Sequence, residues 1–449
     1  MATTTPPDRV ETTTPDAEVS RAISRERGLT RLSRLQTLGV LFGVLGVTLI
    51  ASVAGALPGD DITLVFGLGD AAPKAALDPP NTVLGIGILF VVAAMVALLD
   101  RWTGRYAGVA LAVASVLFVP LVLVCAIALS ATNQTNLLPL FVESLRLGTP
   151  IALGALAGLW CERSGVVNIG IEGMMLAAAG VSFVTYAVMS GGNGGGWLWA
   201  AVVIAIFVGG LMGLLHAVLS VTFRTDQIVS GVAINLLAFG LTAFLRREVL
   251  LPSGVSSAVT LPKVTLPVLS DIPLVGSVLF SGKPIFFMMF IVFVVTKVVL
   301  FRTTWGLRVR SVGENPHAAD TLGIDVIKTR YQAVIVGGLI AGLAGAWFTL
   351  ETVGGFDNGM TNGKGFIALA ALIFGKWRPW SAFGGAMLFG FAEALGSRIQ
   401  FLNVAVGGFP FPSQFLQVLP YVVTIIVLAG AIGRAIPPAA DGIPYERPR

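Results

Sequence analysis

Runs of about twenty apolar residues recur along the 449-residue chain, and they restrict its fold more than any other feature. A helix needs roughly 20 such residues to cross about 30 Å of hydrocarbon. Because backbone amides find no water in lipid, these runs must be helical, and nothing alternates at period two as barrel strands do. We therefore expect an all-α polytopic membrane protein with about 12 transmembrane helices. The runs cover residues 38–57, 82–99, 106–129, 145–161, 165–190, 197–222, 227–245, 284–301, 331–350, 365–375, 382–396 and 414–432.

The distribution of positive charge predicts how these spans are oriented. Only 12% of the residues are charged, against about 25% in soluble domains. If the N-terminus is inside, cytoplasmic segments hold 20 of the 29 Lys and Arg residues and outer loops hold eight. Positive residues concentrate on the cytoplasmic side of membrane proteins. We therefore expect both termini in the cytoplasm of a multi-pass plasma-membrane protein. The net charge of +5 then reflects topology and not nucleic-acid binding.

The polar groups within the spans divide the chain into parts. Residues 1–37 are polar, basic and rich in Thr and Pro, which predicts a disordered cytoplasmic tail. Residues 38–105 contain two spans without embedded polar groups and are expected to form an accessory hairpin. Residues 106–435 contain the remaining spans and their embedded Gly, Asn and Glu residues, so we expect the working part of the protein there. Residues 436–449 form a second cytoplasmic tail.

A basic island at residues 302–330 separates two apolar runs. It contains five of the 29 Lys and Arg residues. Asn is a favourable N-cap and Pro suits the first helical turn, so Asn315-Pro316 predicts a short helix over 315–322. The loop is too short for a catalytic domain, and a helix in such a place is expected to dock into a soluble partner. The residues expected to couple to that partner are Gly313, Glu314, Asn315, Pro316, His317, Ala318 and Ala319.

Two polar clusters inside the spans are candidates for a transport path. Residues 161–175 carry Asn168 and Glu172, and Glu172 lies roughly 10 Å into its span at 1.5 Å per residue. A charge there costs about 2.5–3.5 kcal/mol, so it requires water or a polar partner. The alternative is that Glu172 caps a broken helix or pairs with Arg163. Asn235 lies at a similar depth after the turn at Asp226, which can cap the next helix; its alternative role is hydrogen bonding between helices.

The remaining polar residues indicate no enzymatic site. His216, on an apolar face, is expected to serve helix packing, and Glu351 and Glu393 are expected at the surface near the outer ends of their spans. Cys125 and Cys161 lie in or at the end of apolar runs, so neither a disulfide nor a metal site is expected. No phosphate-binding loop, catalytic triad or metal-ligand spacing occurs, so no cofactor and no catalytic residue are expected. Energy for transport must come from another polypeptide.

Three motifs in order resemble one family of transport proteins. They are ERSGVVNIGIEGMM, HAVLSVTFRTDQIVSGVAINLLAFGLTAFL and RVRSVGENPHAADTLGI. Together they look like the permease subunits of bacterial ABC importers for nucleosides and simple sugars, within the wider ribose and branched-chain amino-acid permease family. The resemblance covers residues 145–432. Residues 1–105 depart from it, because they make the chain longer than typical members.

The resemblance implies a fold and partners. The implied fold is a ten-helix core like that of the vitamin B12 importer, with the coupling helix between core helices six and seven. The implied partners are a second, homologous permease in a heterodimer, a cytoplasmic ATPase that binds the ATP, and an extracytoplasmic solute-binding lipoprotein. Nucleosides are the first expected solute, then simple sugars or branched-chain amino acids. Two other classes stay open: a proton-coupled secondary transporter using Glu172, and a membrane scaffold protein.

Overall fold

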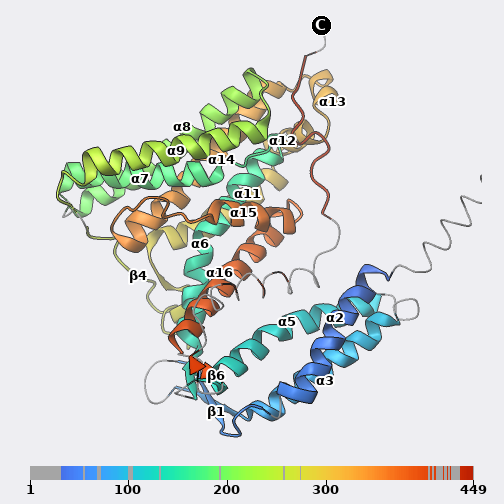
Figure 1. Ribbon diagram of the computed structural model, residues 1–449. Helices are drawn as coiled ribbons and strands as arrows, with labels where there is room; N and C mark the ends of the chain where they lie inside the picture. The colour runs from blue at the N-terminus through green and yellow to red at the C-terminus, as the bar shows by residue number, and fades with distance from the viewer. Residues whose placement is uncertain are drawn as a thin grey trace, which may run out of the picture.

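Helices dominate the computed structural model (Figure 1). Within the described residues, eight helices are long and apolar enough to cross a bilayer, which confirms a polytopic α-helical membrane protein. Two shorter apolar helices, Leu35–Ala51 and Lys364–Phe374, accompany them. The structure describes residues 32–53, 56–67, 72–99, 105–130, 133–191, 194–255, 258–273, 275–402, 405–406, 409–410, 418, 422, 425 and 435–447.

One group of helices packs through glycines. A Cβ atom on Gly209 would lie 2.4 Å from the carbonyl oxygen of Gly338, so α8 and α14 approach closely only because both lack side chains there. Figure 1 shows α7, α8, α9 and α14 lying alongside one another. Their bounds are α7 Ile171–Ser190, α8 Gly195–Ala217, α9 Gln227–Leu245 and α14 Val326–Ala346, with π-helical turns at Val218–Thr222, Arg246–Leu250 and Trp347–Val353.

A second group of helices, α6, α15 and α16, packs against α14 through α6. A Cβ atom on Gly390 would lie 2.4 Å from the nitrogen of Gly148, so α16 and α6 also meet at small residues. α6 begins eight residues earlier than the predicted 145–161 span, because the amide oxygen of Asn136 accepts a hydrogen bond from Leu138 N (3.0 Å) and caps the helix there. The group consists of α6 Leu137–Glu162, α15 Lys364–Phe374 and α16 Pro379–Phe401.

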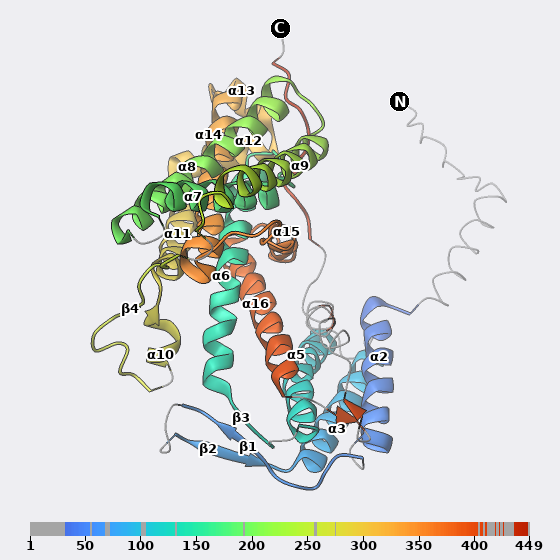
Figure 2. The ribbon, with the colours of Figure 1, turned by 60° about the vertical axis from the view of Figure 1, so that its left-hand side comes forward.

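The N-terminal helices pack against the start of α6 and the end of α16. Their buried side chains form one cluster with Leu137, Leu140 and Ile399 (Figure 2). β1 pairs antiparallel with β2 and parallel with β3, a small sheet that the sequence did not predict. α5 shares this cluster, although its apolar run was assigned to the core. The elements are α2 Arg34–Thr48, a π-helical turn at Leu49–Val53, β1 Ile62–Val65, β2 Lys74–Leu77, α3 Pro79–Leu98, α5 Arg105–Ala128 and β3 Gln134–Asn136.

The two ends of α11 lead into different structures. At one end of α11 the chain continues into two short helices, of which the first was not predicted; at its other end, a small hairpin and a one-turn helix precede it (Figure 2). We call them the α13 end and the α10 end. The predicted span 414–432 lies outside the described residues apart from three isolated positions. The remaining elements are β4 Val264–Thr265, α10 Val275–Leu279, β5 Ser281–Gly282, α11 Pro284–Arg302, α12 Thr304–Glu314, α13 Pro316–Thr321, β6 Ala405–Val406 and β7 Phe409–Pro410.

Candidate functional site

The helix predicted from Asn315-Pro316 is present as α13. The Asn315 side-chain oxygen accepts a hydrogen bond from Ala318 N (3.0 Å), and Pro316 occupies the first turn, as expected for a capped helix start. Pro316 and Ala319 are buried, whereas Asn315, His317 and Ala318 are exposed. Leu322, directly after the helix, is 81% exposed. α13 therefore has an exposed face with both polar and apolar residues, and its opposite face packs against the rest of the protein.

Gly313 and Glu314 connect this helix to the end of α6. A Cβ atom on Gly313 would lie 2.2 Å from the carbonyl oxygen of Arg163, so only glycine fits at this crossing. The Glu314 carboxylate lies 3.7 Å from the Arg163 guanidinium, which also donates two hydrogen bonds to the carbonyl of Trp377 (2.9 and 2.6 Å). Burial lowers the pKa of Arg163, and Glu314 partly offsets this. Gly313 and Glu314 therefore link α13 to the end of α6 and, through Arg163, to the turn before α16.

The carboxylate of Glu172 joins α7 to the start of α15. It accepts hydrogen bonds from the Thr361 hydroxyl (2.6 Å) and from the backbone N–H groups of Gly363 (2.9 Å) and Gly365 (2.6 Å). The first N–H groups of a helix have no partner within it, and a carboxylate there also interacts favourably with the helix dipole. Glu172 thus caps α15 from a position 193 residues before Gly365 in the chain.

Asn235 lies next to Glu172 in space but binds different partners. Its side-chain oxygen accepts a hydrogen bond from Gly173 N (2.7 Å), and its amide donates to the carbonyl of Ile169 (3.1 Å). A Cβ atom on Gly173 would lie 2.7 Å from the Asn235 Cα atom, so glycine permits this approach of α7 and α9. Asn235 therefore bonds α9 to the start of α7 at Gly173, the residue after Glu172, which is the interhelical hydrogen bonding given above as its alternative role. Their role in a transport path stays a prediction.

Asn168 is fully buried, with 0% of its surface exposed. Its amide nitrogen lies 3.3 Å from the Cys161 sulfur and 3.6 Å from the Met174 sulfur, and its side-chain oxygen has no partner in the described structure. The Asn168 side chain therefore exposes no surface to a path in this structure.

Side chains from α8 and α9 form hydrogen bonds to the backbone of the non-helical segment between α6 and α7. His216 bridges the Val167 carbonyl and the Ser230 hydroxyl (both 2.9 Å), which confirms its expected packing role. Gln227, which the sequence did not single out, accepts a hydrogen bond from Val167 N (2.7 Å). The Asp226 carboxylate caps α9 through Ile228 N (2.8 Å), as its place in the turn predicted. Buried backbone groups in this break are thereby satisfied, as membrane interiors require.

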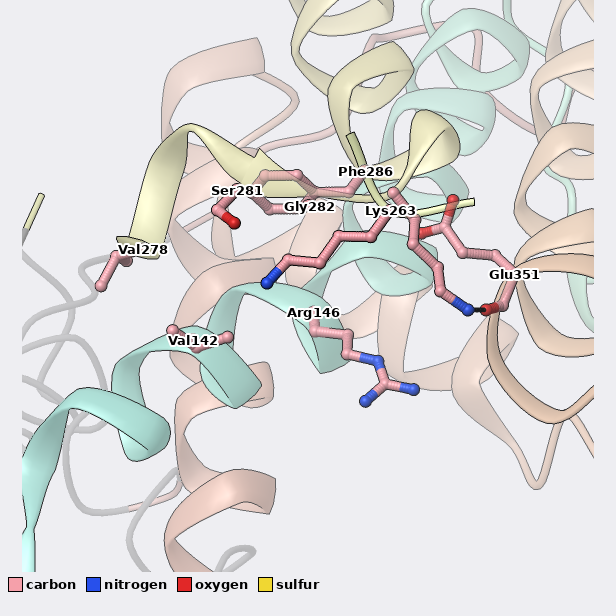
Figure 3. Close-up of a pocket in the computed structure, with 9 residues that line it drawn as sticks. Val142, Arg146, Lys263, Val278, Ser281, Gly282, Phe286 and Glu351 are labelled. Atoms are coloured by element: carbon pink, nitrogen blue, oxygen red, sulfur yellow. Dashed lines mark hydrogen bonds between the residues drawn. The ribbon is translucent and has the colours of Figure 1, made fainter. Parts of the chain in front are cut away.

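A pocket of about 350 Å³ opens at the α10 end. Figure 3 shows Arg146 on α6, Lys263 from the loop before α10 and Glu351 beyond α14. Glu351 was expected at the surface, but it is 2% exposed, because its carboxylate accepts a hydrogen bond from Ile285 N (2.6 Å) and caps α11. Lys283 donates to the Glu351 carbonyl and to the Thr260 hydroxyl (2.8 Å). The pocket is therefore positively charged at its rim.

Glu393 was also expected as a free surface group, but it is half-buried in an ion pair. Lys364, at the start of α15, donates to both of its carboxylate oxygens (2.6 Å each). The lysine side chain is only 10% exposed. A buried lysine requires such a partner, since an unpaired charge inside the bundle is costly.

These features define a polytopic helical membrane protein with a short capped helix after α11 and a charged pocket before it. The chain belongs to the family of permease components of branched-chain amino acid transport systems, whose model matches residues 140–428. The matched region contains α13, Glu172 and the pocket. No solved structure matches the chain.

Curated relatives within this family are named for particular solutes. The chain is 41% identical to the guanosine ABC transporter permease protein NupQ of Bacillus subtilis over 304 residues, which are 66% of this chain and 92% of the relative. It is 39% identical to the nucleoside ABC transporter permease protein NupC of Lactococcus lactis over 70% of this chain and 98% of that protein. A putative glucose ABC transporter permease protein of Haloferax volcanii is 37% identical over 65% of this chain and 91% of its own.

Proposed function

We propose that the chain is a transmembrane permease subunit of an ATP-driven ABC importer that passes nucleosides from a binding protein to the cytoplasm. The observation that carries this proposal is the exposed, capped helix α13 in a member of a permease family. The two relatives named above for guanosine and nucleosides, at 41% and 39% identity, support the solute class. The relative named for glucose makes simple sugars the second candidate, ahead of branched-chain amino acids.

The proposed partners follow from the ends of the molecule. A cytoplasmic ATPase dimer receives α13 in a cleft, a second, homologous permease completes the channel in a heterodimer, and a solute-binding lipoprotein docks at the α10 end. The α13 end then faces the cytoplasm together with both termini, in agreement with the distribution of Lys and Arg. ATP binding shifts the population between outward-open and inward-open states, because the ATPase binds nucleotide differently in the two.

We also propose the finer architecture that the motifs imply. A ten-helix core like that of the vitamin B12 importer occupies residues 106–435, preceded by the accessory hairpin 38–105 and flanked by the tails 1–37 and 436–449. The solute path runs past Glu172 and Asn235, with Asn168 supporting them from behind. Few polar groups line it, which fits a path that must release its solute quickly.

The hydrogen bonds of Glu172 favour this mechanism over proton coupling. Its two carboxylate oxygens accept hydrogen bonds from three donors, so both oxygens are already occupied by contacts that join α7 to α15. A proton carrier needs to alternate between charged and neutral forms, and protonation here would break at least one of these bonds. The carboxylate is thus better suited to a structural cap than to proton transfer.

The test is purification of the tagged chain from its native membrane, followed by reconstitution. We expect an ATPase subunit and a second permease to copurify, and we expect vesicles to accumulate radiolabelled guanosine only with ATP and the binding protein. Unlabelled inosine should compete and glucose should not. Guanosine uptake driven by a pH gradient without any ATPase would establish the secondary transporter instead, and competition by glucose alone would change the solute.

The charged pocket predicts an effect on docking of the binding protein. Reversing both charges, Arg146→Glu and Lys263→Glu, should raise the concentration of loaded binding protein needed for half-maximal transport about tenfold, because rim charges govern association rates. The effect should shrink as salt rises, since a Debye length falls from about 10 Å at 0.1 M to 3 Å at 1 M. Lys74→Glu, an exposed lysine on β2 outside this pocket, is the matched control. Equal losses in both variants would contradict docking at the pocket.

A further inference from the structure

The C-terminal segment 435–447 runs along α12 and α13, although it follows them by more than a hundred residues (Figures 1 and 2). We call it the C-terminal strap. Ala440 N donates a hydrogen bond to the Gly313 carbonyl (2.9 Å), and Gly442 N donates to the Gly165 carbonyl (3.3 Å). Ala439 N donates to the Glu314 carboxylate (3.2 Å). The strap thus joins Gly313 and Glu314, which directly precede α13, to Gly165, which follows the end of α6.

A buried arginine holds the middle of the strap. Arg330, in the first turns of α14, is 1% exposed and donates to the carbonyl of Ile443 (2.9 Å). A Cβ atom on Gly165 would lie 2.9 Å from its guanidinium and 3.0 Å from the Ala440 carbonyl. Burial raises the pKa of Asp441 nearby, and the charge of Arg330 opposes that rise. The strap therefore supplies a hydrogen-bond acceptor to a buried charge.

Tyr445 anchors the end of the strap under α13. It is 6% exposed and packs in one cluster with Val312, Ala319 and Val326, which come from α12, α13 and α14. Its ring also lies 5.2 Å from the His317 ring, between centroids. Because α13 has six residues and buries only two of them, Tyr445 supplies much of the apolar surface on which it rests.

Two ion pairs flank this anchor. The Arg224 guanidinium lies 2.6 Å from the Glu446 carboxylate, and Arg447 lies 3.5 Å from Asp320 on α13. Arg224, Glu446 and Arg447 are exposed, so the first pair contributes little to stability, whereas Asp320 in the second pair is only 19% exposed. These ion pairs fix the position of the strap along α13, and the buried contacts of Tyr445 and Arg330 attach the strap to the protein.

We propose that the C-terminal strap is a positioning element of the coupling machinery, with Tyr445 as the residue that fixes α13 against α12 and α14. This inference rests on the proposed function. A helix that transmits displacement must be held rigidly on its own subunit, or the ATPase moves α13 without moving α6. The strap provides this hold by bonding to Gly313, to Glu314 and to the cluster beneath α13.

The test compares Tyr445→Ala with Tyr445→Phe in the reconstituted complex. We expect Tyr445→Ala to raise the ATP hydrolysed per guanosine imported by about 2- to 30-fold, the range that changes along a coupling element produce. Tyr445→Phe should behave nearly as the wild type, since the ring contacts with Val312, Ala319 and Val326 survive. Membrane abundance and thermal unfolding, measured alongside, separate uncoupling from loss of the subunit.

Cross-linking gives an independent readout of the strap. Arg224→Cys with Glu446→Cys, in a chain whose two own cysteines are replaced by alanine, should join through a short bifunctional thiol reagent, and Tyr445→Ala should lower the yield. An unchanged ratio of ATP to guanosine in a well-folded Tyr445→Ala variant would overturn the proposal, as would an absent cross-link in the parent. If the wild type itself shows no ATP-dependent import, the proposed function fails instead.

Discussion

A Gly/Ser stretch in place of residues 316–319 is expected to abolish solute uptake while the subunit still inserts in the membrane. Pro316 pre-forms the first turn of α13 and Ala319 packs beneath it, so both the helix and its attachment are lost. The nearest spans keep their buried contacts, because α13 contributes only two buried residues. Uptake into vesicles, together with pull-down of the ATPase by the tagged permease, measures both consequences.

Graded variants of the cap act as controls for this result. Asn315→Ser retains an acceptor for Ala318 N and should transport almost normally, whereas Asn315→Ala removes it and costs about 1 kcal/mol of helix stability. Glu314→Lys places a third positive group beside Arg163 and Arg310 and should loosen the hinge. Solute-stimulated ATP hydrolysis at the normal rate in the Gly/Ser variant would rule out docking through α13.

Glu172→Ala is expected to produce the second large loss, in both membrane abundance and transport. Removing the carboxylate leaves the Thr361 hydroxyl and two backbone N–H groups without their acceptor. Each unsatisfied buried group costs about 1–3 kcal/mol, so the start of α15 should separate from α7. Quantitative immunoblotting of membranes and guanosine uptake per inserted molecule measure the two effects separately.

Glu172→Gln distinguishes a cap from a proton carrier. The amide retains one acceptor oxygen for these donors, so we expect most of the transport to remain and its dependence on pH to stay as in the wild type. Glu248→Gln, at a half-exposed position on the π-helical turn after α9, controls for the loss of one charge. If Glu172→Gln inserts normally and yet imports nothing, the carboxylate acts as a titrating group and the mechanism proposed above is wrong.

Local chemistry made part of this protein predictable. The caps at Asp226 and Asn315 act on N–H groups two or three residues away, so spacing alone predicted them. The apolar runs predicted the helical membrane fold, because lipid leaves a spanning backbone no other way to satisfy its hydrogen bonds. The helix start at Leu137 was missed, since its cap Asn136 lies outside the apolar run.

Contacts between distant residues were decided by the tertiary structure. Glu351 was expected in solvent, but its carboxylate accepts a hydrogen bond from Ile285 N, which is 66 residues away in the chain. The groups that donate hydrogen bonds to Glu172 lie 189 to 193 residues after it. Nothing near these carboxylates in the sequence identifies such donors. The faces of a membrane helix are equally uninformative, because lipid-facing and core-facing residues are both apolar.

The sequence by itself determined the class of protein, the place of the capped helix α13 and the identity of its embedded polar groups. Only the tertiary structure showed that Glu172 and Asn235 cap neighbouring helices, and that residues 435–447 return to α13. The physical reason is the distance along the chain over which each interaction acts. The transfer of apolar residues into lipid acts within one span, and helix capping acts within one turn. The contacts of Tyr445 with α13, in contrast, form only once α12, α13 and α14 have packed around it.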